Sequence, residues 1–412
     1  MGKNNLILLC DNYPLSAGEF FIDDEMRVIA TEFDKVLVYT ASADTGKNLN
    51  RFVPYNAEVI SFSRQKLEAG KLKSIFRILK PMFLSELFFA LKKLSLKYWV
   101  SVFKIMYVDM HRATNLKKEL VGLCRAKNID MTDCIFYSYW HDYKALALAM
   151  LRQKCGSVCV ARAHGWDNFP DRYIIKYLPF KPFIVKNLSK TLTVSQAGKD
   201  CLEKYINDNV NTKIIVSRLG KFNGRPLNNK KNNQQFLICS CSNLIELKRV
   251  DKIIEVLSLL DIEHIRWVHF GDGPLRTELE TMAKNKLPNV EYEFRSIVPN
   301  YEILDFYAEN YVDLFINLSS SEGIPVSIME ALSASIPVLA TNVGGTSEAV
   351  NSKNGFLIPA DFDCNSVAQI IDNYLDMNKI EQQAIRRNAY EFWKENYEAR
   401  KNYETFYGII TK

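Results

Sequence analysis

This sequence lacks the spacings that hold metals and the long apolar runs that cross membranes. Its nine cysteines form no Cys-x-x-Cys pair, which argues against zinc-ribbon and zinc-finger arrangements. An odd number of cysteines without such a framework favours reduced, buried thiols, as in a cytoplasmic protein. No uncharged apolar stretch reaches about 18 residues, so no membrane-spanning helix is expected.

Export and lipid-anchoring signals are also missing from the first residues. The apolar stretch within Asn5–Cys10 is too short for the core of a signal peptide, and we interpret it as a buried strand. Met1 and Gly2 begin like a myristoylation site, but Leu6 stands where that signal needs serine or threonine. We therefore expect a cytoplasmic protein, either free or peripheral on the inner face of the cell membrane.

The length and composition indicate two globular domains. A chain of 412 residues is long for a single core, and 48% hydrophobic with 24% charged residues is ordinary for a globular protein. A polar stretch without periodicity, near residues 218–235, separates the two halves. We predict a first domain over residues 1–218, a second over 219–395 and a terminal helix over 396–412.

Short β-rich runs alternate with helical patterns in both halves. In the first half we expect strands at Leu6–Cys10, Lys35–Thr40, Cys134–Tyr137, Ser157–Ala161 and Thr191–Val194, and helices at Asp23–Glu32 and Tyr143–Gln153. In the second half we expect strands at Phe236–Ser240, Ile265–Phe270 and Val290–Phe294, helices at Arg249–Leu260 and Leu275–Asn285, and a long charged helix over Glu381–Phe406. Such alternation implies parallel sheets covered on both faces, so the predicted fold class is α/β with two Rossmann-like domains.

One segment, 318–350, concentrates the functional signals. The mostly apolar run Val312–Leu318 predicts a strand and Pro325–Ala334 predicts a helix, with a Ser/Gly loop between them. Glu322 lies in that loop and Glu330 in that helix, with seven residues between them. A tight turn into a helix directs backbone N–H groups and the positive end of the helix dipole at one point, which suits a phosphate.

The same segment resembles the donor site of family 4 retaining glycosyltransferases. The resemblance rests on the two spaced glutamates, the Gly-x-Pro turn, and the later Pro337-Val338 and Gly344-Gly345 pairs. Further matches are Ala163-His164-Gly165-Trp166-Asp167, Asn243-Leu244-Ile245-Glu246-Leu247-Lys248, Gly271-Asp272-Gly273-Pro274-Leu275 and Asn354-Gly355-Phe356-Leu357. The resemblance implies the GT-B fold, in which two Rossmann-like domains face each other across a cleft and the last helix crosses back to the first domain.

The family also implies a role for each matched position. The expected catalytic residues are Glu322, which contacts the donor sugar, His164, which orients that sugar, and Lys248, which brings positive charge to the phosphate. The expected donor-binding residues are Asn243, Gly18, Gly271, Arg295, Gly323, Ile324, Pro325 and Glu330. The family implies that Glu330 accepts hydrogen bonds from the ribose hydroxyls and that the backbone N–H groups after Glu322 face the diphosphate.

One position departs from the family's pattern. The family has an arginine five residues before Lys248, where this chain has Asn243. Asparagine supplies neither the charge nor the two-pronged hydrogen bonding of a guanidinium group. Either another basic residue compensates, with Arg249 and Arg295 as candidates, or the phosphate clamp is weaker.

Other functions for the acidic residues have less support. Eight helical residues advance about 12 Å, which exceeds the roughly 5–9.5 Å between the carboxyl groups of glycosidases and favours separate roles for Glu322 and Glu330. Asp361-Phe362-Asp363 looks like a metal-binding DxD motif, but an aspartate there is expected to cap the helix that begins near Asn365. We therefore expect neither a metal nor another cofactor.

The segment Arg64–Lys118 is basic and amphipathic. It holds 13 lysines and arginines against three acidic residues. Six apolar residues are expected near one helical face: Leu84, Leu87, Phe88, Leu91, Tyr98 and Val102. Two interpretations stay open, namely peripheral contact with an anionic membrane, or an ordinary helical pair whose apolar stripe faces the domain core. Nucleic acid is not an expected partner, because no recognition module accompanies the charge.

These expectations combine into one functional hypothesis. The chain is expected to be a retaining, metal-independent glycosyltransferase that uses a UDP- or GDP-sugar as donor. Its expected acceptor is a glycan or a lipid-linked glycan in bacterial surface-polysaccharide synthesis. Two other classes stay open: a non-catalytic nucleotide-sugar-binding subunit of a polysaccharide assembly complex, and a GT-B sugar-nucleotide epimerase.

Overall fold

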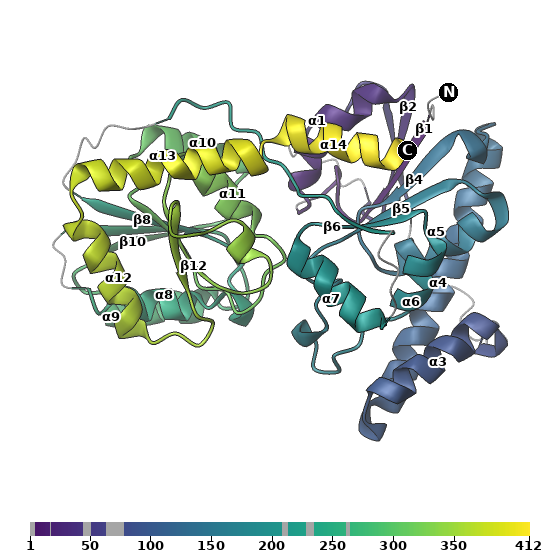
Figure 1. Ribbon diagram of the computed structural model, residues 1–412, viewed down its shortest axis with the longest axis horizontal. Helices are drawn as coiled ribbons and strands as arrows, with labels where there is room; N and C mark the ends of the chain where they lie inside the picture. The colour runs from purple at the N-terminus through teal and green to yellow at the C-terminus, as the bar shows by residue number, and fades with distance from the viewer. Residues whose placement is uncertain are drawn as a thin grey trace. The chain divides into compact units, whose positions relative to one another are not determined.

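A computed structural model of the protein describes residues 5–16, 18–43, 51–62, 78–207, 213–227, 235–260 and 264–412 (Figure 1). Contacts within the chain divide it into two compact units. The first unit comprises Met1–Arg218 and Ala399–Lys412, and the second comprises Leu219–Glu398. Each unit is built around its own parallel β-sheet.

The sheet of the first unit has the strand order β3-β2-β1-β4-β5-β6-β7 within the described residues, and every pairing is parallel. Its strands are β1 Asn5–Cys10, β2 Lys35–Thr40, β3 Ala57–Ser61, β4 Cys134–Ser138, β5 Val158–Ala163, β6 Lys190–Thr193 and β7 Ile214–Val216. The central strands β1 and β4 are buried almost throughout. Continuous apolar runs of this kind suit strands whose two faces are both covered by helices.

Helices cover both faces of this sheet. They are α1 Phe21–Ile29, α3 Pro81–Lys93, α4 Trp99–Ala126, α5 Tyr143–Cys155, α6 Lys181–Asn187, α7 Gln196–Ile206 and α14 Ala399–Thr411. Phe136 of β4 belongs to the core shared with α4, α5 and α6, whereas the ring of Tyr137 lies 5.1 Å from that of Phe406 in α14. Because successive strand residues point to opposite faces, α14 covers the other face, beside α1 (Figure 1).

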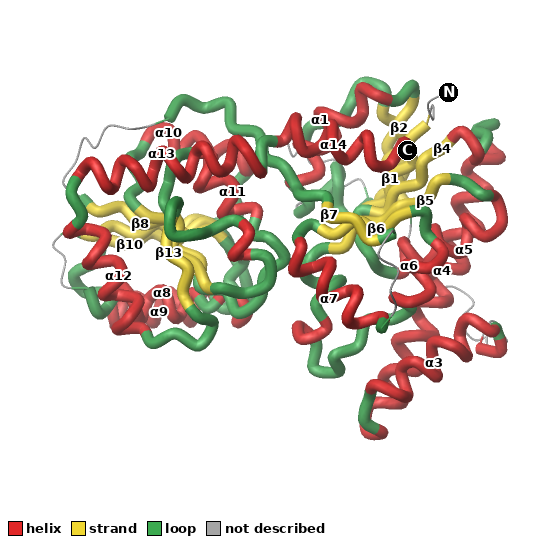
Figure 2. Tube along the Cα trace, in the orientation of Figure 1, coloured by secondary structure: helices red, strands yellow, loops and turns green. Residues whose placement is uncertain are grey.

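The second unit repeats this architecture with a separate core. Its described strands, all parallel, follow the order β10-β9-β8-β11-β12-β13. They are β8 Phe236–Cys241, β9 Ile265–Phe270, β10 Glu291–Arg295, β11 Leu314–Asn317, β12 Val338–Thr341 and β13 Gly355–Ile358. The helices are α8 Val250–Leu257, α9 Arg276–Lys286, α10 Asn300–Glu309, α11 Val326–Ser333, α12 Cys364–Asp376 and α13 Lys379–Asn396. Figure 2 shows these helices arranged around the sheet.

The predicted α/β class with two Rossmann-like domains is confirmed. Lys35–Thr40 and Ile265–Phe270 have the predicted bounds. The strand expected at Val312–Leu318 is shorter, because β11 begins only at Leu314. Asp313 comes before it, and its carboxylate accepts a hydrogen bond from the Leu237 N–H at 2.9 Å. Strands β3, β7, β12 and β13 and helices α6, α7 and α10 had not been expected.

The prediction of one long helix over Glu381–Phe406 is wrong, because this segment forms two helices, α13 and α14, with a break between them. The break is held in place by backbone pairing, because the Lys221 N–H donates to the Tyr397 carbonyl at 2.8 Å and Lys221 forms a β-bridge with Glu398. The Tyr397 ring is buried and its hydroxyl donates to the Glu348 carbonyl at 2.9 Å. Helix α13 therefore ends in the second unit, and α14 belongs to the first.

The basic segment Arg64–Lys118 also differs from its prediction. Residues 63–77 lie outside the described residues, and the rest forms α3 and α4 with a break between them. Helix α3 turns Phe83 and Ala90 to the core, whereas Leu84 and Phe88 are exposed. The apolar residues expected on one helical face therefore do not all point the same way. Some pack against the core and others are exposed. Within the described residues, no helix is both long and apolar enough to cross a membrane.

Candidate functional site

The loop between β11 and α11 carries Glu322 and is anchored on both sides. The Thr341 hydroxyl at the end of β12 donates to the Ser319 carbonyl at 2.5 Å. On the other side, the Ser320 N–H donates to the Leu247 carbonyl at 2.8 Å. These contacts join the carboxyl ends of strands at one edge of the parallel sheet, which is where ligands bind in open α/β folds.

Lys248 and Glu322 meet at this edge. Lys248 ends a single 3-10 turn after β8, and its Nζ lies 2.5 Å from Glu322 Oε1. The Glu322 side chain is 8% exposed and that of Lys248 is 20% exposed, so solvent screens the pair only in part. The structure thus brings together two residues that the sequence assigned to one reaction centre.

Two glycine turns allow the loops to approach one another. Gly344 has φ +54°, and a Cβ there would lie 1.8 Å from the Glu322 carbonyl oxygen. The Gly345 N–H donates to the Gly323 carbonyl at 2.8 Å. Gly271 has φ +140°, and a Cβ there would lie 1.9 Å from the carbonyl oxygen of Ser242, beneath the loop that leads to Lys248. The glycines are therefore required by close backbone packing.

Glu330 is a buried, partnered residue of α11. It is 4% exposed, and its Oε1 accepts a hydrogen bond from Asn300 Nδ2 at 2.5 Å. Lys221 Nζ lies 3.5 Å from the same oxygen. Neither partner was expected from the sequence, because Lys221 falls in the polar stretch interpreted as a linker and Asn300 carries no motif. The two contacts hold the Glu330 carboxylate of α11 against Asn300, the first residue of α10.

The two arginines considered as substitutes for the missing family arginine have other partners. The Arg249 guanidinium donates to the carbonyls of Leu318, Ser319 and Ala360 at 2.6, 3.2 and 2.8 Å. Arg295 donates to Glu293 at 2.9 Å and lies 4.6 Å from the Phe306 ring centroid. Asn243 itself is exposed. Arg249 therefore ties the end of β11 to the loop after β13, and Arg295 pairs along β10.

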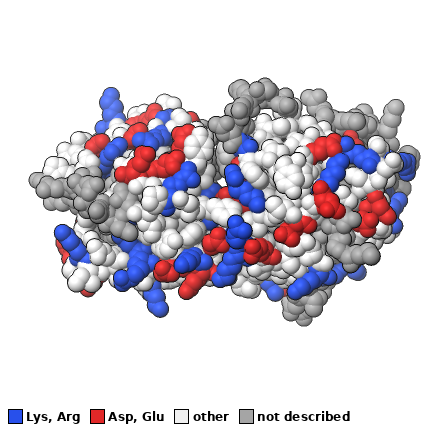
Figure 3. Space-filling model, turned by 90° about the horizontal axis from the view of Figure 1, so that it is seen from above, with Lys and Arg blue, Asp and Glu red and all other residues white. Residues whose placement is uncertain are grey.

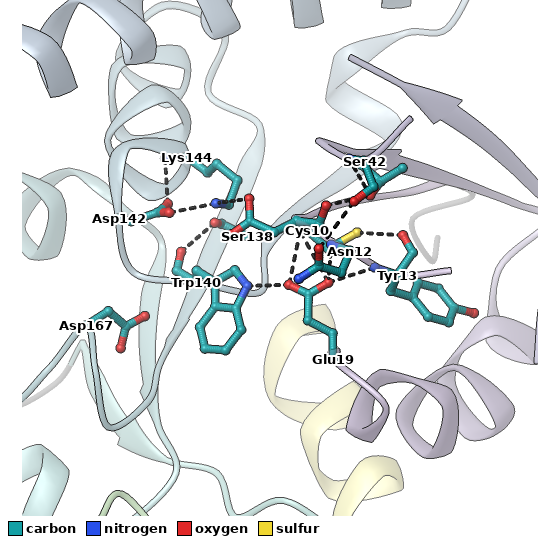
Figure 4. Close-up of polar contacts among 12 residues, drawn as sticks. Cys10, Asn12, Tyr13, Glu19, Ser42, Ser138, Trp140, Asp142, Lys144 and Asp167 are labelled. Atoms are coloured by element: carbon teal, nitrogen blue, oxygen red, sulfur yellow. Dashed lines mark hydrogen bonds and ion pairs between the residues drawn. The ribbon is translucent and has the colours of Figure 1, made fainter. Parts of the chain in front are cut away.

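In the first unit, the loop after β1 is closed around the carboxylate of Glu19 (Figure 4). That carboxylate accepts hydrogen bonds from the backbone N–H groups of Asp11, Asn12 and Tyr13 at 3.0, 2.6 and 2.8 Å. It also accepts one from the indole N–H of Trp140. Gly18, with φ +101°, sits in the turn that leads into Glu19. The backbone N–H groups of this loop, which are arranged as in an anion-binding site, therefore bind the carboxylate of Glu19.

His164 follows β5 and is buried beside this loop. Its Nε2 lies 3.1 Å from the Tyr139 carbonyl, and its ring centroid lies 4.7 Å from that of Trp140. The Asp167 carboxylate accepts the His164 backbone N–H at 2.5 Å, which fixes the turn. Burial, with a smaller contribution from Arg162, lowers the pKa of His164 well below its usual range. The imidazole is therefore neutral near pH 7.

In the Asp361-Phe362-Asp363 sequence, the second aspartate has a structural role. The Asp363 carboxylate accepts the Ser366 backbone N–H at 3.0 Å and caps α12, as the sequence predicted. That hydrogen bond lowers the pKa of Asp363. Among the residues that the structure describes, no group of three or more His, Cys, Asp and Glu side chains is placed to hold a metal ion.

Comparisons with known proteins show a similarity to glycosyltransferases. Residues 226–392, which lie mostly in the second unit, match the family described as glycosyl transferases group 1. A relative from Escherichia coli, named as the colanic acid biosynthesis glycosyltransferase WcaL, is 28% identical over 259 residues, covering 60% of this chain and 62% of the relative. Another from Bacillus subtilis, named as the teichuronic acid biosynthesis glycosyltransferase TuaC, is 28% identical over 181 residues, covering 43% of each chain. The chain spans less than two thirds of the length of these curated relatives.

Solved structures extend the similarity to both units. The crystal structure of HepE from Anabaena, in complex with UDP and glucose, superposes with a TM-score of 0.68 at 16% identity. The match covers 98% of this chain and 99% of HepE, and at this identity it shows the fold. Residues 226–392, less than half of the chain, are therefore similar to the glycosyl transferases group 1 family, and the chain as a whole has the GT-B fold.

Proposed function

We propose that the protein is a retaining, metal-independent glycosyltransferase that moves a sugar from a nucleoside diphosphate sugar to a glycan or lipid-linked glycan. The observation that carries this proposal is the contact between Lys248 and Glu322 at 2.5 Å, in the loop that precedes α11. The loop lies within the part of the chain that matches the glycosyl transferases group 1 family. The expected donor is a UDP- or GDP-sugar.

Breaking the bond between the sugar and the diphosphate leaves negative charge on the phosphate, which the enzyme must stabilise. Lys248 supplies a full positive charge at the site, and the backbone N–H groups of Gly323 and Ile324 precede the positive end of α11. A helix dipole alone contributes only about 0.3–1 kcal/mol, or up to ~2 kcal/mol when partly buried, so the lysine is the larger contribution. We propose that a bound diphosphate replaces Glu322 as the partner of Lys248. Glu322 then accepts hydrogen bonds from the donor sugar.

Glu330 is proposed to hold the ribose of the nucleotide. Its hydrogen bond from Asn300 and its contact with Lys221 leave the carboxylate positioned and charge-balanced before a ligand arrives. Preorganisation of this kind reduces the entropy that binding would otherwise lose. In the first unit, Gly18 and the neutral imidazole of His164 are proposed to contribute to donor recognition. A neutral His164 can exchange hydrogen bonds with a sugar hydroxyl but brings no positive charge.

Relatives named for colanic acid, teichuronic acid and O-antigen synthesis support a surface-polysaccharide acceptor. A lipid-linked acceptor would require contact with a membrane, for which we propose the exposed apolar residues Leu84 and Phe88 of α3 and Trp99 and Val100 of α4. On the face shown in Figure 3, lysines and arginines are interspersed with acidic residues. An electrostatic contact of α3 and α4 with a membrane would depend on local basic clusters more than on the net charge of +6.

One observation favours the alternative of a non-catalytic nucleotide-sugar-binding subunit. Asn243 replaces the family's arginine, and Arg249 and Arg295 are held by carbonyl groups and by Glu293. Of the two basic residues with which the family binds the phosphate, this chain therefore keeps only Lys248. A subunit of that kind would bind the donor but neither transfer nor hydrolyse its sugar.

A donor screen followed by product analysis tests the proposal. Thermal unfolding is measured with UDP- and GDP-sugars, because a ligand at 100 times its dissociation constant stabilises the native state by about 2.7 kcal/mol. The stabilising donor is then incubated with the protein, and the anomeric configuration of the product is determined by NMR. Transfer or hydrolysis with retention supports the proposal. Donor binding without turnover supports the non-catalytic subunit, and an altered sugar still linked to nucleotide supports an epimerase.

A further inference from the structure

A pocket of ≈ 510 Å³ lies in the first unit where α3, α4, α5 and α6 meet. Three lysines line it: Lys80 just before α3, Lys117 in the middle of α4, and Lys154 near the end of α5. Among the described residues that line the pocket, none is acidic. None of the catalytic or donor-binding residues expected from the sequence lines this pocket, whereas five of its lining residues belong to the basic segment Arg64–Lys118.

Lys117 is repelled by the neighbouring lysines of this pocket. Burial lowers the pKa of Lys117, and the nearby charges of Lys154, Lys80 and Lys118 lower it further. An anion bound between Lys117 and Lys154 would remove this repulsion and gain attraction from both ammonium groups. The cluster therefore has the charge pattern of an anion site.

Apart from Ser85 and Gln153, the other lining residues of the pocket are apolar, and an apolar surface continues from its rim. Met82, Met150 and Phe183 contribute apolar lining. Leu84 and Phe88 are 50% and 61% exposed, and each lies three residues, about one turn, from a lining residue of α3. A free sugar phosphate would leave this apolar lining unused, whereas a molecule with both a phosphate and an apolar chain would cover both surfaces.

We propose that this pocket binds the phosphate group of an anionic amphiphile, whose apolar chain then runs over Leu84 and Phe88. Lys117 and Lys154 contact the phosphate, and Lys80 adds positive charge at the rim. The proposal extends the proposed membrane contact by giving it a defined headgroup site. It does not depend on glycosyl transfer, because the predicted property is lipid binding.

Calorimetric titration of the full chain with dihexanoyl phosphatidic acid, below its micelle concentration, tests the proposal. In the variant Lys117→Gln/Lys154→Gln, binding should weaken at least about tenfold, because each lysine near an anionic lipid contributes substantially. The matched control Lys204→Gln/Lys284→Gln removes the same charge from exposed positions on α7 and α9, and it should change binding less than about twofold. Circular dichroism confirms that each variant is folded.

Two further probes separate the possible sources of the phosphate. Inorganic phosphate should bind at least about tenfold more weakly than the lipid, because it gains nothing from the apolar lining. The variant Leu84→Ser/Phe88→Ser should weaken binding of the lipid but not of inorganic phosphate. Equal losses in the pocket and control variants, equal binding of lipid and inorganic phosphate, or no measurable lipid binding would each overturn the proposal.

Discussion

Lys248 Nζ lies 2.5 Å from Glu322 Oε1, although the two residues are 74 positions apart in the sequence. Lys248 follows β8 and Glu322 follows β11, and these strands are neighbours in the sheet of the second unit. The parallel arrangement brings both carboxyl ends to the same edge, so the contact is a consequence of topology. In the proposed reaction, Lys248 of this pair supplies the positive charge that binds the diphosphate.

Replacing Lys248 should remove most of the activity. We expect Lys248→Ala to lower kcat/KM for donor hydrolysis or transfer by about 10²–10³-fold, the usual effect of losing one group that stabilises developing charge. Lys248→Arg should retain part of the activity because it keeps the charge. The control is Lys252→Ala, since Lys252 pairs with Glu255 on the surface of α8. Activity of Lys248→Ala within tenfold of wild type would contradict the assigned role.

Gly344 should be intolerant of a side chain. In Gly344→Ala the new methyl group meets the Glu322 carbonyl at 1.8 Å, and the backbone has φ +54°. We expect the free energy of unfolding to fall by more than about 2 kcal/mol, with a matching loss of donor affinity, because the loop must move. Urea unfolding and donor titration measure the two effects.

Gly122 is the matched control for that substitution. It lies inside helix α4, and a Cβ there would have nothing within 4 Å. Gly122→Ala should therefore raise the free energy of unfolding by about 0.5–1 kcal/mol through its better helix propensity. Similar destabilisation by both substitutions would show that close packing at Glu322 is not the cause.

His164 should stay neutral in mildly acidic solution. Its pKa in the folded protein is well below the usual value, so protons bind the unfolded chain first as the pH falls. The contribution of His164 to stability is therefore fully present above about pH 6.5 and is lost as the pH falls from there toward its folded pKa. NMR of ¹⁵N-labelled histidine should show a neutral imidazole at pH 5.5. A ring that titrates near pH 6.5 would refute this assignment.

Glu19 should organise the loop after β1. We expect Glu19→Gln to lower the free energy of unfolding by about 1.5–3 kcal/mol, because charge-assisted hydrogen bonds from backbone amides are lost. Tryptophan fluorescence should also shift, since the indole N–H of Trp140 loses its charged hydrogen-bond acceptor. Glu32→Gln, at an exposed position of the same unit, should leave both readouts unchanged. Equal effects of the two substitutions would mean that the amides of Asp11 and Asn12 do not depend on Glu19.

Local patterns were sufficient to predict much of the second unit. Hydrophobic runs and turn residues placed β8, β9 and β10 within a residue or two of their bounds. Strands β8 and β9 are mostly buried, whereas β10 is a partly exposed edge strand whose apolar residues still marked its position. The apolar run at Val312–Leu318 and the helical pattern at Pro325–Ala334 likewise placed Glu322 in a loop and Glu330 in a helix. Such patterns depend only on residues that are close together in the sequence, so they can be recognised in one sequence without a structure.

Contacts between distant parts of the chain could not be predicted in this way. Lys221 looked like part of a linker, yet it is buried and lies near the Glu330 carboxylate. Asn300 and Trp140 also acquire their partners only through tertiary packing. The split of the last helix had the same origin, since its cause is backbone pairing with Lys221. No periodicity or motif accompanies these positions.

A crystal structure of the protein with a bound nucleoside diphosphate tests the central claim most directly. We predict diphosphate oxygens within hydrogen-bonding distance of Lys248 Nζ and of the backbone N–H groups of Gly323 and Ile324, with the ribose hydroxyls on Glu330. A nucleotide bound elsewhere in the second unit, with the Lys248–Glu322 contact unchanged, would contradict the account.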